Sequence, residues 1–257
     1  MMEQKEQAVG AIRAELQAAA VTQLPDFIEK YQGDPRAGVQ SLVQKAKKQL
    51  LALQKERERI RTLSRYEREY EAAGFLCGID EVGRGPLAGP VVAGAVILPK
   101  DCEILYINDS KKLTEKKREE LYDVIMEQAI ATGIGIVGPA RIDEINILQA
   151  TYEAMREAIG KLSVTPDLLL NDAVTIPGVL IRQVPIIKGD AKSISIGAAS
   201  IIAKVTRDRM MVEYDTIMPE YGFASNKGYG SAAHIEALKK YGPSPIHRAS
   251  FIKNFCG

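Results

Sequence analysis

The chain has 257 residues, of which 46% are hydrophobic and 26% are charged, and its formal net charge is +1. This composition is ordinary for a soluble globular protein. A net charge near zero excludes a domain whose overall charge is strongly basic, as in many nucleic-acid binders. It does not exclude nucleic-acid binding itself, because acids gathered at one site can cancel basic residues elsewhere on the surface. Three widely spaced cysteines, Cys77, Cys102 and Cys256, match neither a disulfide framework nor the spacing of zinc ligands. The chain shows no signal-peptide pattern and no apolar run of membrane-span length, so we expect a soluble cytoplasmic protein without membrane contact.

Residues 1–72 have the texture of a helical extension, rich in Gln, Glu, Lys, Arg and Ala and nearly free of strand patterns. We expect short helices over 8–20 and 24–31, a break at 33–35 and a long helix over 36–70. The basic residues of the long helix fit a solvated face of a helical bundle or an arm that rests on a nucleic-acid backbone. The interspersed glutamates favour the first interpretation. We expect a second domain over 73–257.

From residue 75 the pattern changes to alternating strands and helices. Apolar runs predict strands over 75–79, 91–98, 133–137, 167–170 and 179–187, and periodic patterns predict helices over 114–131, 141–162, 193–218 and 231–241. The opening strands follow each other directly, whereas the later strands are separated by helical crossovers. This order predicts an α/β fold with a mixed sheet flanked by helices.

Three of the predicted strands lead into carboxylates: Asp80 with Glu81, then Asp172, then Asp190. One acid at a strand end is commonly a cap or a turn former, but three such ends in one domain indicate a ligand site. Oxygen ligands without sulfur or imidazole suit Mg²⁺ or Mn²⁺, and a chain with two histidines offers little for a His-based triad. Two such ions about 4 Å apart can activate water and stabilise a leaving oxygen, which is phosphodiester chemistry.

The adjacency of Asp80 and Glu81 sets a geometric condition. Neighbours on a regular strand face opposite sides of the sheet. Both side chains can serve one metal site only if the strand ends or bulges there, which the glycines at Gly83 and Gly85 permit.

Several residues near these acids in the sequence are candidates for substrate contacts. Glycines let the backbone approach a ligand closely, lysines can contact phosphate, and a tyrosine in a glycine-flanked loop can stack on a sugar or base. Each also has an ordinary alternative, as a tight turn, a solvated lysine or an exposed loop aromatic. The candidates are Gly83, Arg84, Gly85, Lys111, Lys112, Lys227 and Tyr229.

Five spaced motifs together make the region 75–251 resemble ribonuclease HII, the bacterial type 2 ribonuclease H family. They are G-I-D-E-V-G-R-G-P-L-A-G-P, N-D-S-K-K-L, L-L-L-N-D, K-G-D followed by A-A-S-I-I-A-K-V-T-R-D-R, and Y-G-F-A-S-N-K-G-Y-G. The chain departs from the common pattern in having Asn226 before K-G-Y, where many members have histidine, and Ala173 after Asp172, where glycine is frequent. Neither departure removes an expected metal ligand.

The resemblance implies a ribonuclease H-like fold for this region, while the helical residues 1–72 lie outside the shared domain and receive no role from it. It also implies Mg²⁺- or Mn²⁺-dependent hydrolysis of RNA in RNA–DNA hybrids and of single ribonucleotides embedded in duplex DNA. By position, the family's four acids fall on Asp80, Glu81, Asp172 and Asp190. The family's G-R-G turn, here 83–85, reads the ribonucleotide 2′-hydroxyl, and Tyr229 packs at the RNA–DNA junction.

Three readings follow, and in each we expect a monomer. The first is a ribonuclease HII, with a water attacking on the 5′ side of a ribonucleotide. The second is a ribonuclease HIII, which shares the fold and prefers longer hybrids; Arg84 and the helical N-terminal region speak against it. The third is a non-catalytic nucleic-acid-binding module, which the presence of all four acids disfavours.

Overall fold

The computed structural model describes residues 7–255, so Cys256 lies outside the described residues. The chain divides into two compact units, Met1–Arg59 and Ile60–Gly257. The boundary expected after residue 72 stays a prediction.

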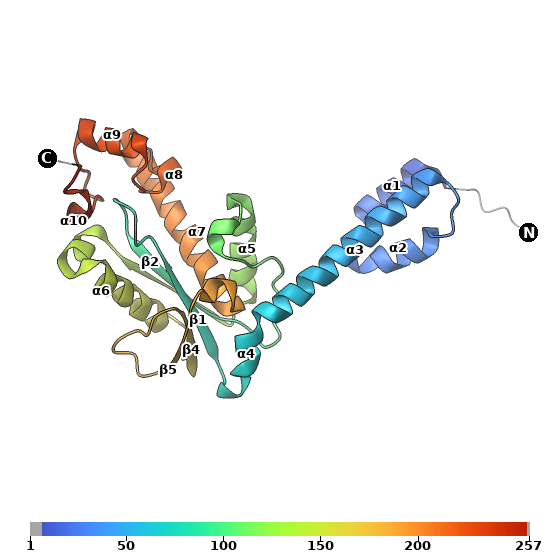
Figure 1. Cartoon of the computed structure of the whole chain (residues 1–257), viewed down its shortest axis with the longest axis horizontal. Helices are drawn as coiled ribbons and strands as arrows, with labels where there is room; N and C mark the ends of the chain where they lie inside the picture. Colours follow the sequence, from blue (N-terminus) through green and yellow to red (C-terminus); the bar gives the residue numbers. More distant parts are fainter. Residues whose placement is uncertain (1–6, 256–257) are drawn as a thin grey trace, which may run out of the picture. The chain divides into compact units, whose positions relative to one another are not determined.

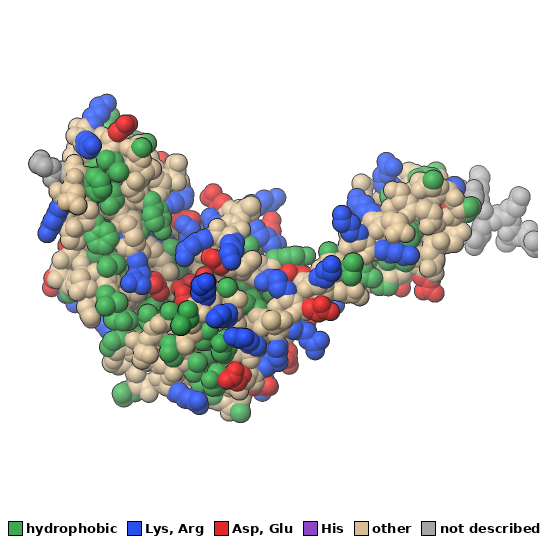
Figure 2. Space-filling view, viewed as in Figure 1, with side chains coloured by type: hydrophobic (Ala, Val, Ile, Leu, Met, Phe, Trp, Pro, Cys, Tyr) green, Lys and Arg blue, Asp and Glu red, His purple; other side chains and the backbone are tan. Residues whose placement is uncertain are grey.

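The first unit is helical, as the composition of its sequence predicts. It contains α1 (Val9–Ala18), α2 (Leu24–Tyr31) and the first part of α3 (Ala37–Leu63). The apolar faces of these helices pack into one small core built from Ile12, Leu16, Leu24, Phe27, Tyr31, Val39, Leu42, Val43 and Ala46. Lys and Arg side chains recur along α3 (Figure 2).

The single helix expected over 36–70 is wrong in its length. Helix α3 ends at Leu63, and α4 (Arg65–Glu69) follows after a break at Ser64. The Ser64 hydroxyl donates to the carbonyl oxygen of Ile60 at 2.9 Å. Serine commonly competes for backbone carbonyls in this way, which weakens a helix interior and favours a break.

The second unit is built on a five-stranded sheet of order β3-β2-β1-β4-β5 in the part of the chain that the structure describes. Its strands are β1 (Leu76–Val82), β2 (Val91–Ile97), β3 (Ala131–Val137), β4 (Leu168–Asp172) and β5 (Arg182–Ile186). β1 and β3 both pair with β2 in antiparallel register, and β4 pairs in parallel with both β1 and β5. The predicted mixed sheet is confirmed, with β1 at its centre.

Helices cover both faces of this sheet (Figure 1). α6 (Pro139–Gly160) packs on one face, while α7 (Ile194–Ile217), joined by α5 (Glu115–Gln128), packs on the other. Gly78 allows α7 to approach β1 closely, because a Cβ atom there would lie 2.1 Å from the carbonyl carbon of Ser195. The core is split accordingly between the two faces of the sheet.

Helix α6 is not the uninterrupted helix expected over 141–162. Asn146 has φ +67° and ψ 163°, which breaks the helical path. Its side-chain oxygen accepts hydrogen bonds from the backbone of Leu148 at 3.0 Å and Gln149 at 3.2 Å. The side chain therefore acts as a helix N-cap at this break.

Shorter elements complete the unit. The turns η3 (Ser110–Lys112) and η4 (Gly189–Ala191) precede α5 and α7, and α8 (Phe223–Asn226), α9 (Ala232–Tyr241) and α10 (Ala249–Ile252) follow α7. Of these, α8 and α10 were not expected from the sequence. Among the described residues, no helix is both long and apolar enough to cross a membrane.

Candidate active site

Asp80 and Glu81 lie within the central strand, close to its carboxyl end. β1 continues to Val82 in regular register, with Asp80 opposite Gly94 and Glu81 opposite Ala93 of β2. The predicted strand end at residue 79 is therefore wrong, and the strand does not bulge at these acids. In a regular strand the two side chains start from opposite faces of the sheet.

The two acids have different partners. Asp80 takes the face covered by α7 and accepts a hydrogen bond from the hydroxyl of Ser200. Arg84 Nη1 lies 3.2 Å from Glu81 Oε1 in an ion pair. Glu81 therefore has a cationic partner, and Asp80 has only neutral donors.

Asp172 and Asp190 are joined through a short turn. Asp172 is the last residue of β4, next to β1, and its Oδ1 accepts a hydrogen bond from the backbone N–H of Gly189 at 2.7 Å. Asp190 follows directly in η4. The strand pairing thus gathers at one end of the sheet four acids that are widely spaced in sequence.

Burial dominates the electrostatics of Asp80 and Glu81. Burial raises the pKa of Asp80 well above its usual range, and the charges of Glu81 and Asp172 raise it further. Burial also raises the pKa of Glu81; Arg84 opposes this shift and Asp172 adds to it. These carboxylates act on one another, so a cation placed among them would be stabilised.

A fifth acid, Asp109, acts electrostatically on Asp190, one of the candidate metal ligands. Burial raises the pKa of Asp190, and the charges of Asp109 and Asp172 raise it further, whereas Lys111 lowers it. Asp109 also accepts a hydrogen bond from the backbone N–H of Lys111 at 3.0 Å. The N-D-S-K-K-L loop therefore lies beside the acids, which its place in the sequence did not reveal.

The donor set fits a hard divalent cation by chemistry, because it consists of carboxylate oxygens. Among residues 7–255, no three His, Cys, Asp or Glu side chains converge as a metal-ion cage would require. The carboxylates must therefore rotate toward a common point to share an ion.

The two substrate loops predicted from the sequence lie together in the fold. A Cβ atom on Gly85 would lie 3.9 Å from the ring of Tyr229. The backbone N–H groups of Leu87 and Ala88 both donate to the carbonyl oxygen of Gly228, at 2.8 and 3.3 Å. Tyr229 is 45% exposed, so its ring is available beside the G-R-G turn.

Gly83 is required for the path of this turn. Its φ is +88°, and a Cβ atom there would lie 2.3 Å from Arg207 Nε. Any other residue would be strained and would displace a buried side chain.

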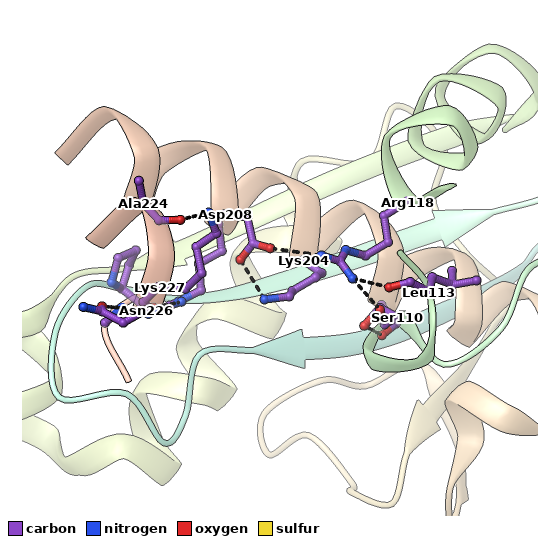
Figure 3. A network of polar contacts seen from close by, with 12 residues as sticks. Ser110, Leu113, Arg118, Lys204, Asp208, Ala224, Asn226 and Lys227 are labelled. Carbon is purple, nitrogen blue, oxygen red and sulfur yellow. Dashed lines mark hydrogen bonds and ion pairs between the residues drawn. The ribbon is translucent and has the colours of Figure 1, made fainter. Parts of the chain in front are cut away.

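The predicted lysines differ in how free they are. Lys111 and Lys112 are exposed, and Lys112 Nζ lies 3.9 Å from Asp109 Oδ2. The ammonium of Lys227 instead donates to the carbonyl oxygen of Ala224 at 2.5 Å (Figure 3). Lys227 is therefore turned toward its own loop.

Helix α7 adds polar residues whose role the sequence did not indicate. Ser200 hydrogen-bonds Asp80 and also lies 2.9 Å, between hydroxyl oxygens, from Ser110 of the N-D-S-K-K-L loop. One turn further on, Lys204 donates to Asp208 at 2.7 Å, as helical spacing predicts, and Arg118 approaches the other Asp208 oxygen at 3.7 Å (Figure 3). Ser110 lies in the N-D-S-K-K-L motif and Ser200 in A-A-S-I-I-A-K-V-T-R-D-R, so their membership in these motifs is the sequence feature that could have identified them.

Two buried histidines support the loop of Tyr229. The Ser244 backbone N–H donates to His247 Nδ1 at 2.9 Å, so His247 carries its proton on Nε2 and donates to His234 Nε2 at 3.0 Å. His234 Nδ1 then donates to the Tyr229 carbonyl oxygen at 2.8 Å. Burial lowers the pKa of His234, and burial with the His234 charge lowers the pKa of His247 to about 4.

Comparison with known proteins identifies the family. The family model described as Ribonuclease HII matches residues 77–254, and the model described as Ribonuclease HII N-terminal domain matches residues 8–71. The chain belongs to the ribonuclease HII family. The Ribonuclease HII of Lachnoclostridium phytofermentans is 72% identical over 226 residues, covering 88% of this chain and 89% of the relative. The Ribonuclease HII of Clostridioides difficile is 53% identical over 252 residues, covering 97% of this chain and 99% of the relative.

Solved structures share the fold. The crystal structure of ribonuclease H2 from Pyrococcus horikoshii OT3 matches with a TM-score of 0.58 and 31% identity, covering 68% of this chain and 92% of that one. The crystal structure of Bst-RNase HIII in complex with Mn²⁺ matches with a TM-score of 0.52 and 17% identity, covering 70% of this chain and 64% of that one. The second likeness concerns the fold alone. The predicted ribonuclease H-like fold is confirmed, and the chain is a nuclease of the ribonuclease H type.

Proposed function

We propose that this ribonuclease HII hydrolyses the RNA strand of RNA–DNA hybrids and cuts duplex DNA on the 5′ side of single embedded ribonucleotides. The products carry 3′-hydroxyl and 5′-phosphate ends. The observation that carries the proposal is the position of Asp80 and Glu81 on the same strand that leads into the G-R-G turn, with Tyr229 beside that turn.

Asp80, Glu81, Asp172 and Asp190 are the proposed ligands of Mg²⁺ or Mn²⁺. When bound, such a cation would lower the pKa of a water molecule and neutralise charge on the reacting phosphate. The protein's own contribution is to hold the carboxylates in place. Ser200 orients Asp80 by a hydrogen bond, and the Gly189 N–H orients Asp172 at 2.7 Å.

The G-R-G turn is proposed to recognise the ribonucleotide. Gly83 sets the path of the turn, and the exposed Gly85 leaves the backbone open to close approach, so that backbone amide groups can meet a 2′-hydroxyl, the group that distinguishes RNA from DNA. Tyr229, 45% exposed beside Gly85, packs against the sugar or base at the junction.

Three lysines are proposed to contact phosphates. Lys111 and Lys112 are exposed on η3 beside the acids. Lys227 contacts a phosphate by exchanging its bond to the Ala224 carbonyl oxygen for one to a phosphate oxygen.

We further propose that residues 1–72 form an accessory region and that 73–257 form the catalytic domain. We also propose that the enzyme acts as a monomer in the cytoplasm.

The test is cleavage of an end-labelled DNA duplex with one ribonucleotide, beside an all-DNA duplex and a continuous hybrid of the same sequence. We expect one cut 5′ of the ribonucleotide with Mg²⁺ or Mn²⁺ and none with a chelator. Cutting of the hybrid without cutting of the single-ribonucleotide duplex would overturn the proposed specificity, and equal cutting with a chelator would overturn the metal dependence.

A further inference from the structure

Two arginines of the second unit are completely buried. Arg207 lies on α7, and Arg248 directly precedes α10; both side chains have 0% exposure. Arginine is rarely buried to this extent unless a carboxylate pairs with it.

Every hydrogen bond from Arg207 goes to a backbone carbonyl oxygen. Its Nε donates to Pro90 at 2.9 Å, its Nη1 to Lys227 at 2.8 Å and its Nη2 to Ala88 at 3.0 Å. One guanidinium therefore ties the segment after the G-R-G turn to the K-G-Y loop.

Arg248 holds the G-R-G turn itself. Its Nη2 donates to the Gly83 oxygen at 2.5 Å and its Nη1 to the Arg84 oxygen at 3.0 Å. Its Nε and Nη2 also donate to the Gly89 oxygen, at 2.9 and 2.8 Å. The planar fork of arginine can make this set of bonds, which a lysine ammonium cannot reproduce.

The charges of both arginines lack a direct counter-ion. In the described part of the chain, neither guanidinium has an ion pair with a carboxylate, and Asp208 and Asp143 act on Arg207 and Arg248 only at longer range. Burial lowers the pKa of Arg207, and burial together with Arg207 lowers that of Arg248 to about 9. Arg248 therefore remains protonated at neutral pH. An uncompensated buried charge is costly, so a binding anion nearby would be favoured.

The bonds to Arg248 also fix the direction of the peptide groups of the turn. The described residues contain no cis peptide bond, so each N–H points opposite to the preceding carbonyl. With the Gly83 and Arg84 carbonyls turned toward the buried guanidinium, the N–H groups of Arg84 and Gly85 point away from it. Neither N–H has a hydrogen-bond partner among residues 7–255.

We propose that Arg248, assisted by Arg207, is a positioning residue for ribonucleotide recognition: it holds the carbonyls of the G-R-G turn inward, so that the turn's free N–H groups face the substrate and the buried positive charge lies behind the turn. This inference rests on the proposed function, because it assumes that the turn contacts the ribonucleotide.

The main test compares Arg248→Lys, Arg248→Met and Arg207→Lys with wild type in steady-state cleavage of a single-ribonucleotide duplex and of a continuous hybrid. Arg248→Lys keeps the charge and loses the fork. We expect its kcat/KM to fall at least tenfold on the single-ribonucleotide duplex and much less on the hybrid, with little change in Tm. Arg248→Met should in addition weaken the salt dependence of KM, since it removes the charge.

The control is Arg209→Met. Arg209 lies on α7, the helix of Arg207, and its partly exposed side chain pairs with Glu119. Its loss should leave the ratio of single-ribonucleotide cleavage to hybrid cleavage at the wild-type value. An equal loss on both substrates that follows a lower Tm would assign Arg248 a merely structural role and overturn the proposal. If Arg248→Met fails to fold, Arg248→Lys decides the question.

Hydrogen exchange gives a readout independent of cleavage. The N–H groups of Leu87, Ala88 and Gly89 are bonded to Gly228 and Ile246 in the wild-type fold. We expect peptides over 83–90 to exchange faster in Arg248→Lys than in wild type or Arg209→Met, and unchanged exchange would overturn the positioning role. If wild type does not cut the single-ribonucleotide duplex, the proposed function fails, and this measurement still decides whether Arg248 holds the turn.

Discussion

The two sides of the candidate site carry opposite charges that are handled in opposite ways. On one side, Asp80, Glu81, Asp172 and Asp190 lie near one another, and burial and repulsion raise the pKa of three of them. On the other side, the cations Arg207 and Arg248 are buried without ion pairs among residues 7–255 and donate hydrogen bonds to backbone oxygens.

The difference separates chemistry from recognition. The carboxylates have few hydrogen-bond donors and need a cation to be stable together. The guanidinium groups already donate hydrogen bonds to backbone carbonyl oxygens in the folded chain, and their uncompensated positive charge favours an anion such as phosphate. The acid side is therefore completed by a ligand, and the arginine side is preorganised by the fold.

Among the proposed changes, replacing Asp80 with Asn should reduce cleavage most strongly. Losing metal-ion stabilisation worth several kcal/mol lowers kcat by about 10²–10⁴-fold. The Tm should rise at neutral pH, because the fold raises the pKa of Asp80 and so disfavours its charged form. Steady-state cleavage and thermal unfolding measure the two effects.

Asp34→Asn is the matched control for this change. Asp34 lies in the first unit, and hydrogen bonds from Arg36 lower its pKa. Its loss should leave cleavage unchanged and should not raise Tm. Near-normal cleavage by Asp80→Asn would contradict the assignment of the acids.

On the recognition side, Tyr229→Ala should weaken cleavage of the single-ribonucleotide duplex by about 5–150-fold, the range expected for losing one aromatic stack of about 1–3 kcal/mol. Tyr229→Phe keeps the ring and should retain most of the activity. Tyr241→Ala, which removes another exposed tyrosine, serves as the control. Equal activities of Tyr229→Ala and Tyr229→Phe would show that the Tyr229 ring does not stack on the substrate.

The histidines beside the buried arginines should make stability depend on pH. The unfolded chain protonates His247 near pH 6.5, whereas the folded chain does so near pH 4. The unfolded state therefore binds more protons in this window, and the free energy of unfolding falls as the pH drops through it.

Denaturant unfolding of wild type and His247→Asn between pH 7 and pH 4 checks this effect. The acids with raised pKa contribute with the opposite sign, so the difference between the two proteins isolates His247. Asn can accept the Ser244 N–H through its side-chain oxygen, and we expect a flatter profile for it. Parallel profiles would contradict the neutral histidine pair.

The smallest expected effect is on duplex binding, and it comes from exposed lysines on α3 of the first unit. No acid lies between Asp34 and Glu56, and Lys45, Lys48 and Lys55 are exposed at spacings that place them on one side of α3. If this side contacts a nucleic-acid backbone, the triple change of these lysines to Gln lowers the salt slope of duplex binding by about 0.9 per lost contact.

Binding of an uncleavable duplex at several salt concentrations measures this slope. The control changes Lys239, Lys240 and Lys253 to Gln, which removes the same charge from the second unit. Identical slopes for the first variant and wild type would leave the first unit without a role in substrate binding.

Much of the fold could be predicted because local patterns agreed with it. Apolar runs located the strands, and the helix predicted over 231–241 matches α9, with Ser231 as its N-cap. Helix breaks were harder, since Ser64 and Asn146 interrupt periodic patterns through side-chain bonds to the backbone. Such bonds depend on local geometry that periodicity does not encode.

The candidate acids could be collected from the sequence because each comes at the end of an apolar run. Arg248 and the histidine pair could not, because their importance lies in contacts across long sequence separations, such as Arg248 to Gly83. A buried arginine and a solvated one look alike in sequence. Asp109 was missed for the same reason, as its neighbour Asp190 lies far along the chain.

The central claim is that the clustered carboxylates bind a divalent cation that the chemistry requires. Titration of Mn²⁺ into the full chain, followed by the electron paramagnetic resonance of free Mn²⁺, tests it without relying on cleavage. We expect wild type and Asp34→Asn to remove Mn²⁺ from solution equally, and Asp80→Asn to remove far less. Equal binding by Asp80→Asn and wild type would contradict the account.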